Sequence, residues 1–412
     1  MNYQFIDNLP TNEFDAFSKN HDLTSIFQIS SWASVKKEWK PLFTAVKNDN
    51  EIIASGLVLI RKMPLGYTLF YLPRGPLIDF CNQELLLFYF ENLKLLAKKH
   101  RAIMIKIDPN CLLSITPVKE FLGRESVRNS LIIDNLKALG FKHFGFNEDL
   151  YSSSQPRYNA VFYYQNDYEE KLKQSKAYKL YTKAEKKGVY CEFAGVEALD
   201  VFSDIMHLTE QRKGVALRNR DYFKSLLDNF EENSVIVLSK LNLKTYNKDL
   251  LQSQKELKNQ MKNPDIGTRK KEQISSQIDA LKHEIEHIHN LRKEDGDIVT
   301  LNASLMVKDK HTSNFLYSGL NSKYQKYYGP YFAQFNKIRW SFEQGCLRCD
   351  FGGIPGTLDD GLSEYKSSYN PSIDEYIGEF DLPTNKLIYP LFTFLLPQVK
   401  KLFKLIAKVK RK

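Results

Sequence analysis

The residues best suited to chemistry lie in one short stretch, Gly345–Gly356, which reads GCLRCDFGGIPG. Its Asp350-Phe351-Gly352 triplet matches the metal-binding triplet of protein kinases. Cys346 and Cys349 have the C-x-x-C spacing of redox and zinc sites. The glycines that follow could cradle a phosphate group. These three chemistries exclude one another, so the rest of the chain has to decide among them.

None of the three chemistries finds support elsewhere in the sequence. A kinase needs a glycine-rich loop, a strand lysine and an H-R-D loop before its D-F-G triplet, and the chain has none of them. The phosphate-loop patterns G-x-x-x-x-G-K-[ST] and G-x-G-x-x-G are also missing. A zinc or redox centre needs a second cysteine pair or a thioredoxin-like unit, but Cys81, Cys111 and Cys191 are scattered. We therefore expect buried thiols at 346 and 349, no metal site and no bound cofactor.

The charge balance indicates an anionic partner. Lysine and arginine outnumber the acidic residues by 59 to 49, a net charge of +10, which favours nucleic acid, phosphate or an anionic membrane face. The chain has no G-x-S-x-G nucleophile elbow, so we expect any transfer reaction to use a substrate that is already activated. Basic and aromatic residues are mixed in five stretches: Trp32–Pro41, Leu72–Pro76, Gln155–Tyr158, Ser175–Gly188 and Leu208–Phe223.

The cysteine content favours a cytoplasmic protein with reduced thiols. The five cysteines are an odd number spread over 412 residues, and the first residues, MNYQFIDNLP, lack the basic and apolar regions of a signal peptide. The longest apolar run, Leu387–Pro397, is short and interrupted by proline, so we expect no transmembrane helix.

Two sets of elements have to position these residues. Apolar periodicity predicts a β-hairpin from Pro41, a helix through Leu86–Leu96 and a buried strand that ends at Asp108. A similar order of strands and helices follows, up to the strand that contains LRCDFGG. The repeated order predicts an α/β (α+β) protein with two similar domains. We place the first domain at 1–150, completed by about 380–396, and the second at 151–379.

The segment 242–295 differs in composition from both domains. Apolar residues recur there with the 4,3 spacing of a coiled coil, on two arms separated by the turn NPDIG. We expect an antiparallel helical hairpin inserted in the second domain, either a strut or oligomer contact, or a docking arm for a large ligand such as tRNA. We expect its histidines, His283, His287 and His289, to be solvated, because they lack a converging third ligand.

Taken together, the motifs resemble the FemABX family of aminoacyltransferases, which add branch or cross-bridge amino acids to bacterial peptidoglycan precursors. The resemblance implies two GNAT-like domains, and a coiled-coil hairpin is present in the tRNA-using members that act on lipid-linked precursors. The matching stretches follow the family's order over nearly the whole chain: FQISSWASVKKEWKP, YLPRGPLIDF, IKIDPN, QPRY, SKAYKLYTKAEKKGV, HLTEQRKG, FLYSGLN, CDFGGIPG, GLSEYKSSYN and EYIGEFDLP.

The resemblance also implies residues that bind the substrate. Lys36 and Arg212 match positions that hold the phosphates of the precursor. Thr209 and Tyr317 match pocket positions close to them.

For catalysis, the resemblance implies a lysine in an aromatic-lysine pair. Tyr365 and Lys366 match this pair, in which the lysine takes part in aminoacyl transfer and the tyrosine is a binding residue. Asp108 matches an acid that has been considered as a base. An ammonium group at position 366 would stabilise the oxyanion that forms when an amine attacks an aminoacyl ester.

The reaction implied by the resemblance is tRNA-dependent transfer of alanine, serine or glycine to the stem-peptide amine of a lipid-linked peptidoglycan precursor, lipid II. The partners would be aminoacyl-tRNA as co-substrate, the precursor and the cytoplasmic membrane face, with no cofactor. One alternative is a GNAT-like scaffold protein of cell-wall synthesis that has lost catalysis, although the retained Tyr365-Lys366 pair argues against it. A second is an N-acyltransferase that uses acyl-CoA, which would need a pantetheine-cradling loop that the sequence lacks. The transferred amino acid and the oligomeric state stay open.

The final segment, 397–412, predicts a basic amphipathic helix. Val399, Leu402, Ile406 and Val409 form one apolar stripe among seven cationic residues. Such a helix suits the surface of an anionic membrane. The alternative is a terminal helix that packs on the first domain and ends in a solvated basic tail.

Overall fold

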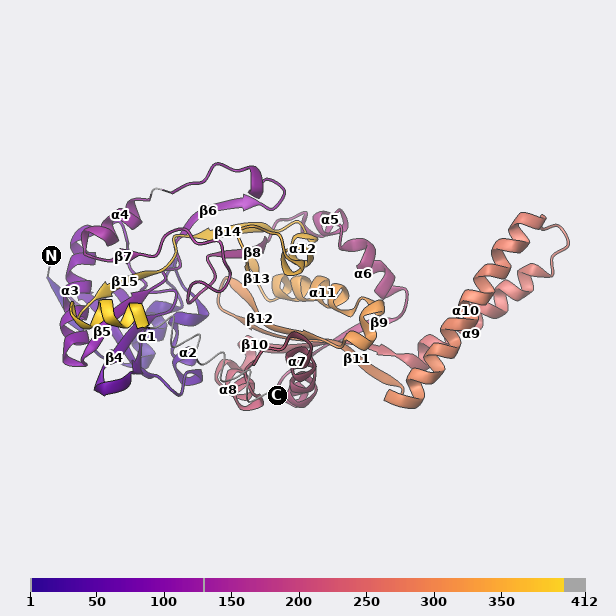
Figure 1. The fold of residues 1–412 in the computed structure, drawn as a ribbon, viewed down its shortest axis with the longest axis horizontal. Helices are drawn as coiled ribbons and strands as arrows, with labels where there is room; N and C mark the ends of the chain where they lie inside the picture. The colour runs from indigo at the N-terminus through magenta and orange to yellow at the C-terminus, as the bar shows by residue number, and fades with distance from the viewer. Residues whose placement is uncertain (1, 129, 396–412) are drawn as a thin grey trace.

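A computed structural model of the chain describes residues 2–128 and 130–395. Within these residues the strands form two mixed sheets, one rich in N-terminal strands and one built mainly from the second half of the chain, with a helical hairpin projecting beyond them (Figure 1). The α/β architecture of two mixed units with an inserted hairpin, predicted from the sequence, is confirmed.

The first sheet packs on the long helix α3 (Gln83–Lys99). Leu86, Phe90 and Leu93 of α3 are buried in the core of this sheet, as their helical spacing predicts. The Asn82 side chain caps the helix by accepting the backbone N–H of Leu85. In spatial order the strands are β1 (Tyr3–Ile6), β2 (Lys40–Asn48), β3 (Glu51–Lys62), β4 (Thr68–Leu72), β5 (Ala102–Ile107), β15 (Phe380–Pro383) and β7 (Lys142–His143), and the other helices here are α1 (Thr11–Ser18), α2 (Ser30–Val35) and α4 (Leu131–Ala138).

The chain exchanges strands between the two sheets. Strand β15, late in the sequence, pairs with β5 and β7 of the first sheet. Strand β6 (Leu112–Pro117) pairs with β14 (Ser372–Tyr376) of the second sheet, although β6 lies within the range expected for the first domain. The strands of each sheet therefore come from separate stretches of the chain.

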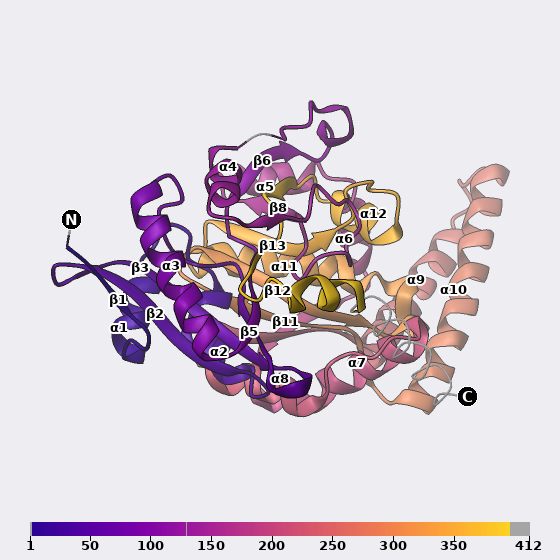
Figure 2. The ribbon, with the colours of Figure 1, turned by 60° about the vertical axis from the view of Figure 1, so that its left-hand side comes forward.

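The second sheet has helices on both faces. In both views α11 (Gly329–Glu343) and α12 (Gly361–Ser367) lie on one side, and α7 (Leu199–Lys213) and α8 (Arg220–Phe230) on the other (Figure 1 and Figure 2). The helices α5 (Tyr168–Lys173) and α6 (Tyr178–Glu185) complete this half. In spatial order the strands are β6, β14, β8 (Tyr158–Tyr163), β13 (Arg348–Ile354), β12 (Thr312–Leu320), β11 (Ile298–Lys308), β10 (Ser234–Asn242) and β9 (Val189–Ala194).

The neighbouring strands β12 and β13 diverge inside the second sheet. They run parallel and pair only from Thr312–Asn314 to Arg348–Asp350. Beyond these residues β13 carries a bulge between Asp350 and Gly353, where its pairing with β8 shifts. The divergence leaves room for cavities in the middle of an otherwise continuous sheet.

A shared apolar core joins the two halves. Trp32 and Ala45 from the first half are buried in one cluster with Phe202, Phe223 and Leu305 from the second. Burial of large apolar side chains contributes roughly 1.5–3 kcal/mol for each of them. The two sheets are therefore held together by packing and not only by the chain that connects them.

The inserted segment forms the helices α9 (Leu243–Met261) and α10 (Thr268–Asp295), which pack against each other and project away from both sheets (Figure 2). Tyr246, Leu250 and Ile288, at its base, belong to the core of the second sheet. Toward the tip Met261 is exposed. The hairpin is thus anchored at its base, and its two arms pack against each other toward the exposed tip.

Among residues 2–128 and 130–395, no helix is both long enough and apolar enough to cross a membrane. The basic helix predicted at 397–412 lies outside the described residues.

Candidate functional site

Four of the residues expected at the site line one cavity beside the point where β12 and β13 diverge. Thr209, Arg212, Tyr365 and Lys366 meet around an open space of about 630 Å³, which we call the lysine cavity. The same walls include residues from β11, β12, β13 and α11: Asn302, Phe315, Ser318, Gly319, Leu320, Pro330, Tyr331, Gln334, Lys337 and Phe351.

Lys366 occupies the floor of the lysine cavity and is fixed in place. Its side chain is only 9% exposed, and its Nζ donates a hydrogen bond to the carbonyl oxygen of Gly353 at 2.9 Å. Burial and the nearby charge of Lys213 lower the pKa of Lys366 to about 8, although Asp350 and Asp360 oppose the shift. The group therefore stays mostly cationic at neutral pH and can stabilise a developing negative charge.

A second lysine in this cavity, Lys337 on α11, was missed by the sequence analysis. It is 3% exposed, and its Nζ donates to Ser304 Oγ at 3.3 Å and lies 4.6 Å from the centre of the Phe315 ring. Burial, with the positive charge of Lys366, lowers its pKa to about 7. A signal was available, because Lys337 shares the buried face of α11 with Ala333 and Ser341, four residues away on either side.

The other members of the lysine cavity differ in how free their polar groups are. Arg212 is exposed. The Thr209 hydroxyl donates to the Ile205 carbonyl and accepts the N–H of Leu320, so it already has a partner in each role. The Tyr365 hydroxyl donates to the Pro330 carbonyl at 3.0 Å. Arg212 is therefore the freest of these three to meet a ligand, and the binding roles of the other two stay predictions.

Lys36 lies in a different groove, of about 600 Å³, that shares no lining residue with the lysine cavity. Its Nζ donates to the Tyr222 hydroxyl at 3.0 Å and lies 4.2 Å from the centre of the Trp32 ring. Burial and the charge of Arg218 lower the pKa of Lys36 to about 8. We call this the Lys36 groove.

Tyr317 lies beside the Lys36 groove. Its ring centre is 5.1 Å from that of Phe223 and 6.3 Å from that of Tyr222. Arg212 lies in the last turn of α7, and residues 217–219 before α8 line the Lys36 groove. The connection between these helices therefore lies between Lys36 and Arg212. A ligand that contacts both Lys36 and Arg212 would have to extend past this connection.

Asp108 lines neither the lysine cavity nor the Lys36 groove. It is 2% exposed, and its carboxylate accepts hydrogen bonds from the Tyr71 hydroxyl and the Arg74 backbone N–H, both at 2.6 Å. Burial raises its pKa to about 7, against the opposing effect of Arg74. These contacts support a loop-organising role for Asp108, and its proposed role as a base stays a prediction.

The GCLRCDFGGIPG stretch forms the strand β13 and its bulge. The Asp350 carboxylate accepts hydrogen bonds from the backbone N–H of Gly352 and from Asn159, both at 2.7 Å. Gly352 adopts a φ of 81°, where a side chain would be strained. Cys346 and Cys349 are buried, as expected, and burial raises the pKa of Cys346 to about 11. The stretch thus shapes the floor under Lys366.

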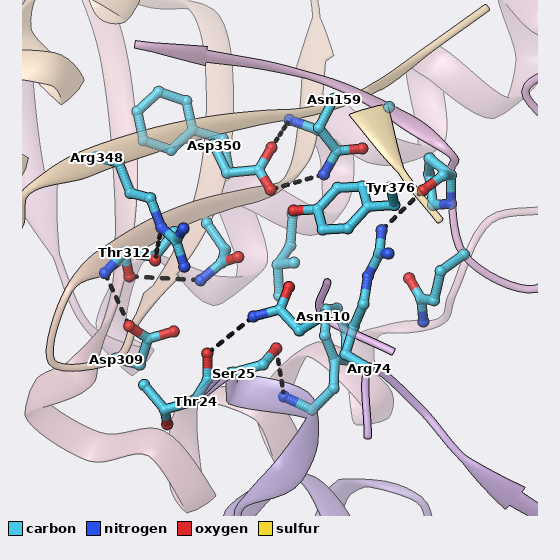
Figure 3. A pocket seen from close by; sticks show the side chains of 18 residues that line it. Thr24, Ser25, Arg74, Asn110, Asn159, Asp309, Thr312, Arg348, Asp350 and Tyr376 are labelled. Carbon is cyan, nitrogen blue, oxygen red and sulfur yellow. Dashed lines mark hydrogen bonds between the residues drawn. The ribbon is translucent and has the colours of Figure 1, made fainter. Parts of the chain in front are cut away.

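A smaller polar cavity of about 220 Å³ lies on the other side of this floor, between the two halves of the molecule (Figure 3). We call it the interdomain cavity. Thr24, Ser25, Arg74 and Asn110 come to it from the first half, and residues from β8, β12, β13 and β14 close it from the second. In the sequence, the stretch LPRGP, which contains Arg74, was recognisable only as one of several segments that carry basic or aromatic residues.

Comparison with known proteins agrees with this arrangement. The FemAB family model matches residues 9–396. Aminoacyltransferase FemB of Staphylococcus epidermidis (strain ATCC 12228 / FDA PCI 1200) is 28% identical over 407 residues, 94% of this chain and 97% of that protein. Aminoacyltransferase FemA of S. epidermidis (strain ATCC 35984) is 27% identical over 372 residues, 84% of this chain and 88% of that protein.

A crystal structure of FemX superimposes with a TM-score of 0.75 and 27% identity, and the match covers 96% of this chain and all of that one. The shared fold and the match over nearly the whole chain lead to one assignment: the chain belongs to the FemAB family and is an aminoacyltransferase.

Proposed function

We propose that the chain transfers an amino acid from aminoacyl-tRNA to the stem-peptide amine of a lipid-linked peptidoglycan precursor. The observation that carries the proposal is the lysine cavity, where an anchored lysine lies beside an exposed arginine in a space large enough for an aminoacyl ester. Such a reaction needs no nucleophile from the protein, because the ester of aminoacyl-tRNA is already activated.

Lys366 supplies electrostatic stabilisation in this mechanism. The attack of the acceptor amine on the ester carbonyl puts negative charge on the carbonyl oxygen, and the tRNA hydroxyl leaves when the tetrahedral intermediate collapses. The Lys366 ammonium, held by the Gly353 carbonyl, is cationic at neutral pH and needs no rearrangement to act. Fixed cations of this kind are effective because their orientation is set before the reaction starts.

Lys36 and Arg212 bind the phosphates of the precursor in this proposal. The two cations lie on either side of the connection between α7 and α8, which suits an extended substrate more than a compact one. Charge-assisted contacts to phosphate form in the ground state and persist in the transition state, so these residues act mainly on binding.

The hairpin of α9 and α10 is the proposed contact for the tRNA. It projects from the same half of the molecule that holds the lysine cavity (Figure 1), and the net charge of +10 suits a polyanion. We also propose that the protein works at the inner face of the plasma membrane, where the lipid-linked precursor would meet it.

An assay with defined substrates tests this function. Purified protein is incubated with lipid II and with tRNA charged with alanine, serine or glycine, and the lipid product is weighed by mass spectrometry. We expect a mass increase equal to one residue of the amino acid that is accepted. A parallel reaction with the acyl-CoA of the same amino acid tests the alternative donor. Product from acyl-CoA and none from tRNA would contradict the proposal.

A further inference from the structure

Two arginines of the interdomain cavity have no ion-pair partner among the described residues. Arg74 is 5% exposed, donates from Nη2 to the Pro156 carbonyl at 2.7 Å and stacks 3.7 Å from the centre of the Tyr376 ring. Arg348 is half-buried and donates from Nε to Thr312 Oγ1 at 2.5 Å. The two side chains reach the cavity from its two sides (Figure 3).

Two other arginines of low exposure, one buried and one half-buried, are paired among the described residues. Arg157 and Arg124 both form salt bridges with Glu375. This is the usual arrangement, because a buried charge is costly unless an opposite charge compensates it. Asp108 lies near Arg74, and Asp309 and Asp374 lie near Arg348, but none of these carboxylates forms a salt bridge with either arginine among the described residues. Two guanidinium groups without a salt bridge at one cavity therefore offer hydrogen-bond donors to an anion.

The carboxylates near the two arginines are held by other donors. Asp309 accepts the backbone N–H groups of His311 and Thr312, and the Tyr163 hydroxyl donates to both oxygens of Asp374. Asp108, next to Arg74, and Asp350, on β13, each accept two hydrogen bonds, as described above. The terminal nitrogens of Arg348 are thus left available to a ligand.

The remaining walls suit peptide groups. Amide side chains can both donate and accept, which matches the two sides of a peptide bond, and Asn159 Oδ1 is buried with no hydrogen-bond partner among the described residues. The volume of about 220 Å³ is below the roughly 300–1,000 Å³ of sites for drug-sized ligands. The amide side chains that line the cavity are those of Asn110, Gln155, Asn159 and Asn314.

We propose that the interdomain cavity binds the carboxylate terminus of a peptide, with Arg348 and Arg74 as its cationic donors. A planar guanidinium matches a carboxylate with two parallel hydrogen bonds. A phosphate dianion suits the cavity less, because Asp309 and Asp350 also line it.

The position of the cavity indicates which peptide this is. Gly352 and Gly353 line the interdomain cavity, and the Gly353 carbonyl holds Lys366 from the other side. Phe315 lines both cavities, so they are neighbours, and we infer that a peptide anchored here by its carboxylate presents a preceding side-chain amine toward the lysine cavity. This step rests on the proposed function, in which the acceptor is the stem peptide of the precursor.

Direct binding tests the proposal without relying on transfer. The probes are N-acetyl-alanyl-alanine, its C-terminal amide and inorganic phosphate, each titrated into the full-length protein by isothermal calorimetry at low salt. We expect the free carboxylate to bind at least about tenfold more tightly than the amide, since a hydrogen bond to a charged group contributes about 1.5–3 kcal/mol. Equal affinities, or no binding of either peptide, would overturn the proposal, and preferential binding of phosphate would overturn the carboxylate assignment.

Variants locate the site. Arg348→Met and Arg74→Met should each weaken carboxylate binding about tenfold or more. Arg348→Lys should recover only part of the loss, because an ammonium group cannot form the two parallel hydrogen bonds of a planar guanidinium. Arg101→Met, at an exposed arginine that does not line the cavity, should bind as the wild type does. Unchanged affinity in Arg348→Met and Arg74→Met places the ligand elsewhere. Because these measurements need no tRNA, carboxylate binding in a protein that fails the lipid II assay would reject the proposed function and leave this site standing.

Discussion

Replacing Lys337 by methionine is expected to stabilise the protein in a pH-dependent way. Methionine has a similar length, and the lysine makes a single hydrogen bond of 3.3 Å among the described residues. Its pKa falls from 10.5 to about 7 on folding, which at about 1.36 kcal/mol per pKa unit corresponds to about 5 kcal/mol against folding at pH values below about 7, where the lysine is charged in both states.

The sign of the pH dependence follows from proton counting. Between pH 7 and 10.5 the unfolded state binds more protons at Lys337 than the folded state does, so wild-type stability rises with pH in this window. The destabilisation is about 5 kcal/mol at pH 6 and falls to about 1 kcal/mol at pH 9.5. Because replacement of buried charges by apolar groups commonly gains about 1–4 kcal/mol, we expect Lys337→Met to gain about 2–4 kcal/mol at pH 6 and distinctly less at pH 9.5.

Urea unfolding of both proteins at pH 6 and pH 9.5, followed by circular dichroism and tryptophan fluorescence, measures this difference. Lys36 also has a lowered pKa, but it is present in both proteins and cancels in the comparison. Lys366 is coupled to Lys337 by charge repulsion, so the loss of that repulsion adds to the gain of Lys337→Met at pH 6. Lys98→Met, at an exposed lysine of α3, is the matched control and should change stability little at either pH. Parallel pH profiles for wild type and Lys337→Met, or a loss of stability at pH 6, would show that the lysine is paired or hydrated in the folded protein.

Three further predictions concern activity. Lys366→Met should lower kcat about 100- to 1000-fold with the thermal unfolding transition retained. The kcat of the wild type should fall as the pH rises through about 8, because Lys366 then loses its proton. A kcat that rises through this pH would make Lys366 a base instead. Lys36→Ala should raise KM for the precursor more than it lowers kcat. As Lys36 loses its charge near pH 8, KM should rise for the wild type only. A normal KM with a strongly lowered kcat in the variant would assign Lys36 a role in catalysis and not in binding. A third variant replaces residues 254–275, which lie beyond the anchored base of the hairpin, by a short glycine-rich turn. It should keep nearly the same unfolding temperature and have a raised KM for aminoacyl-tRNA. Normal use of tRNA by this variant would make the hairpin a strut or an oligomer contact.

The sequence by itself determined the elements and the family. The helical spacing of Leu86, Phe90 and Leu93 predicted α3 and its buried face, and the 4,3 spacing with an intervening turn predicted the two packed arms of the hairpin. These signals are local, because the periodicity of a helix or strand depends on residues within a few positions of one another. The order of motifs along the chain likewise sufficed to indicate an aminoacyltransferase.

Only the tertiary structure decided which of these residues share a site. It brought Arg212 and Lys366 to one cavity, placed Lys36 in another groove and enclosed Asp108 with Tyr71 and Arg74. Such groupings depend on where β12 and β13 diverge and on strands exchanged between sheets, which no local pattern encodes. The lowered pKa of Lys337 and the unpaired state of Arg348 have the same origin, since burial and missing partners arise from contacts between segments far apart in the chain.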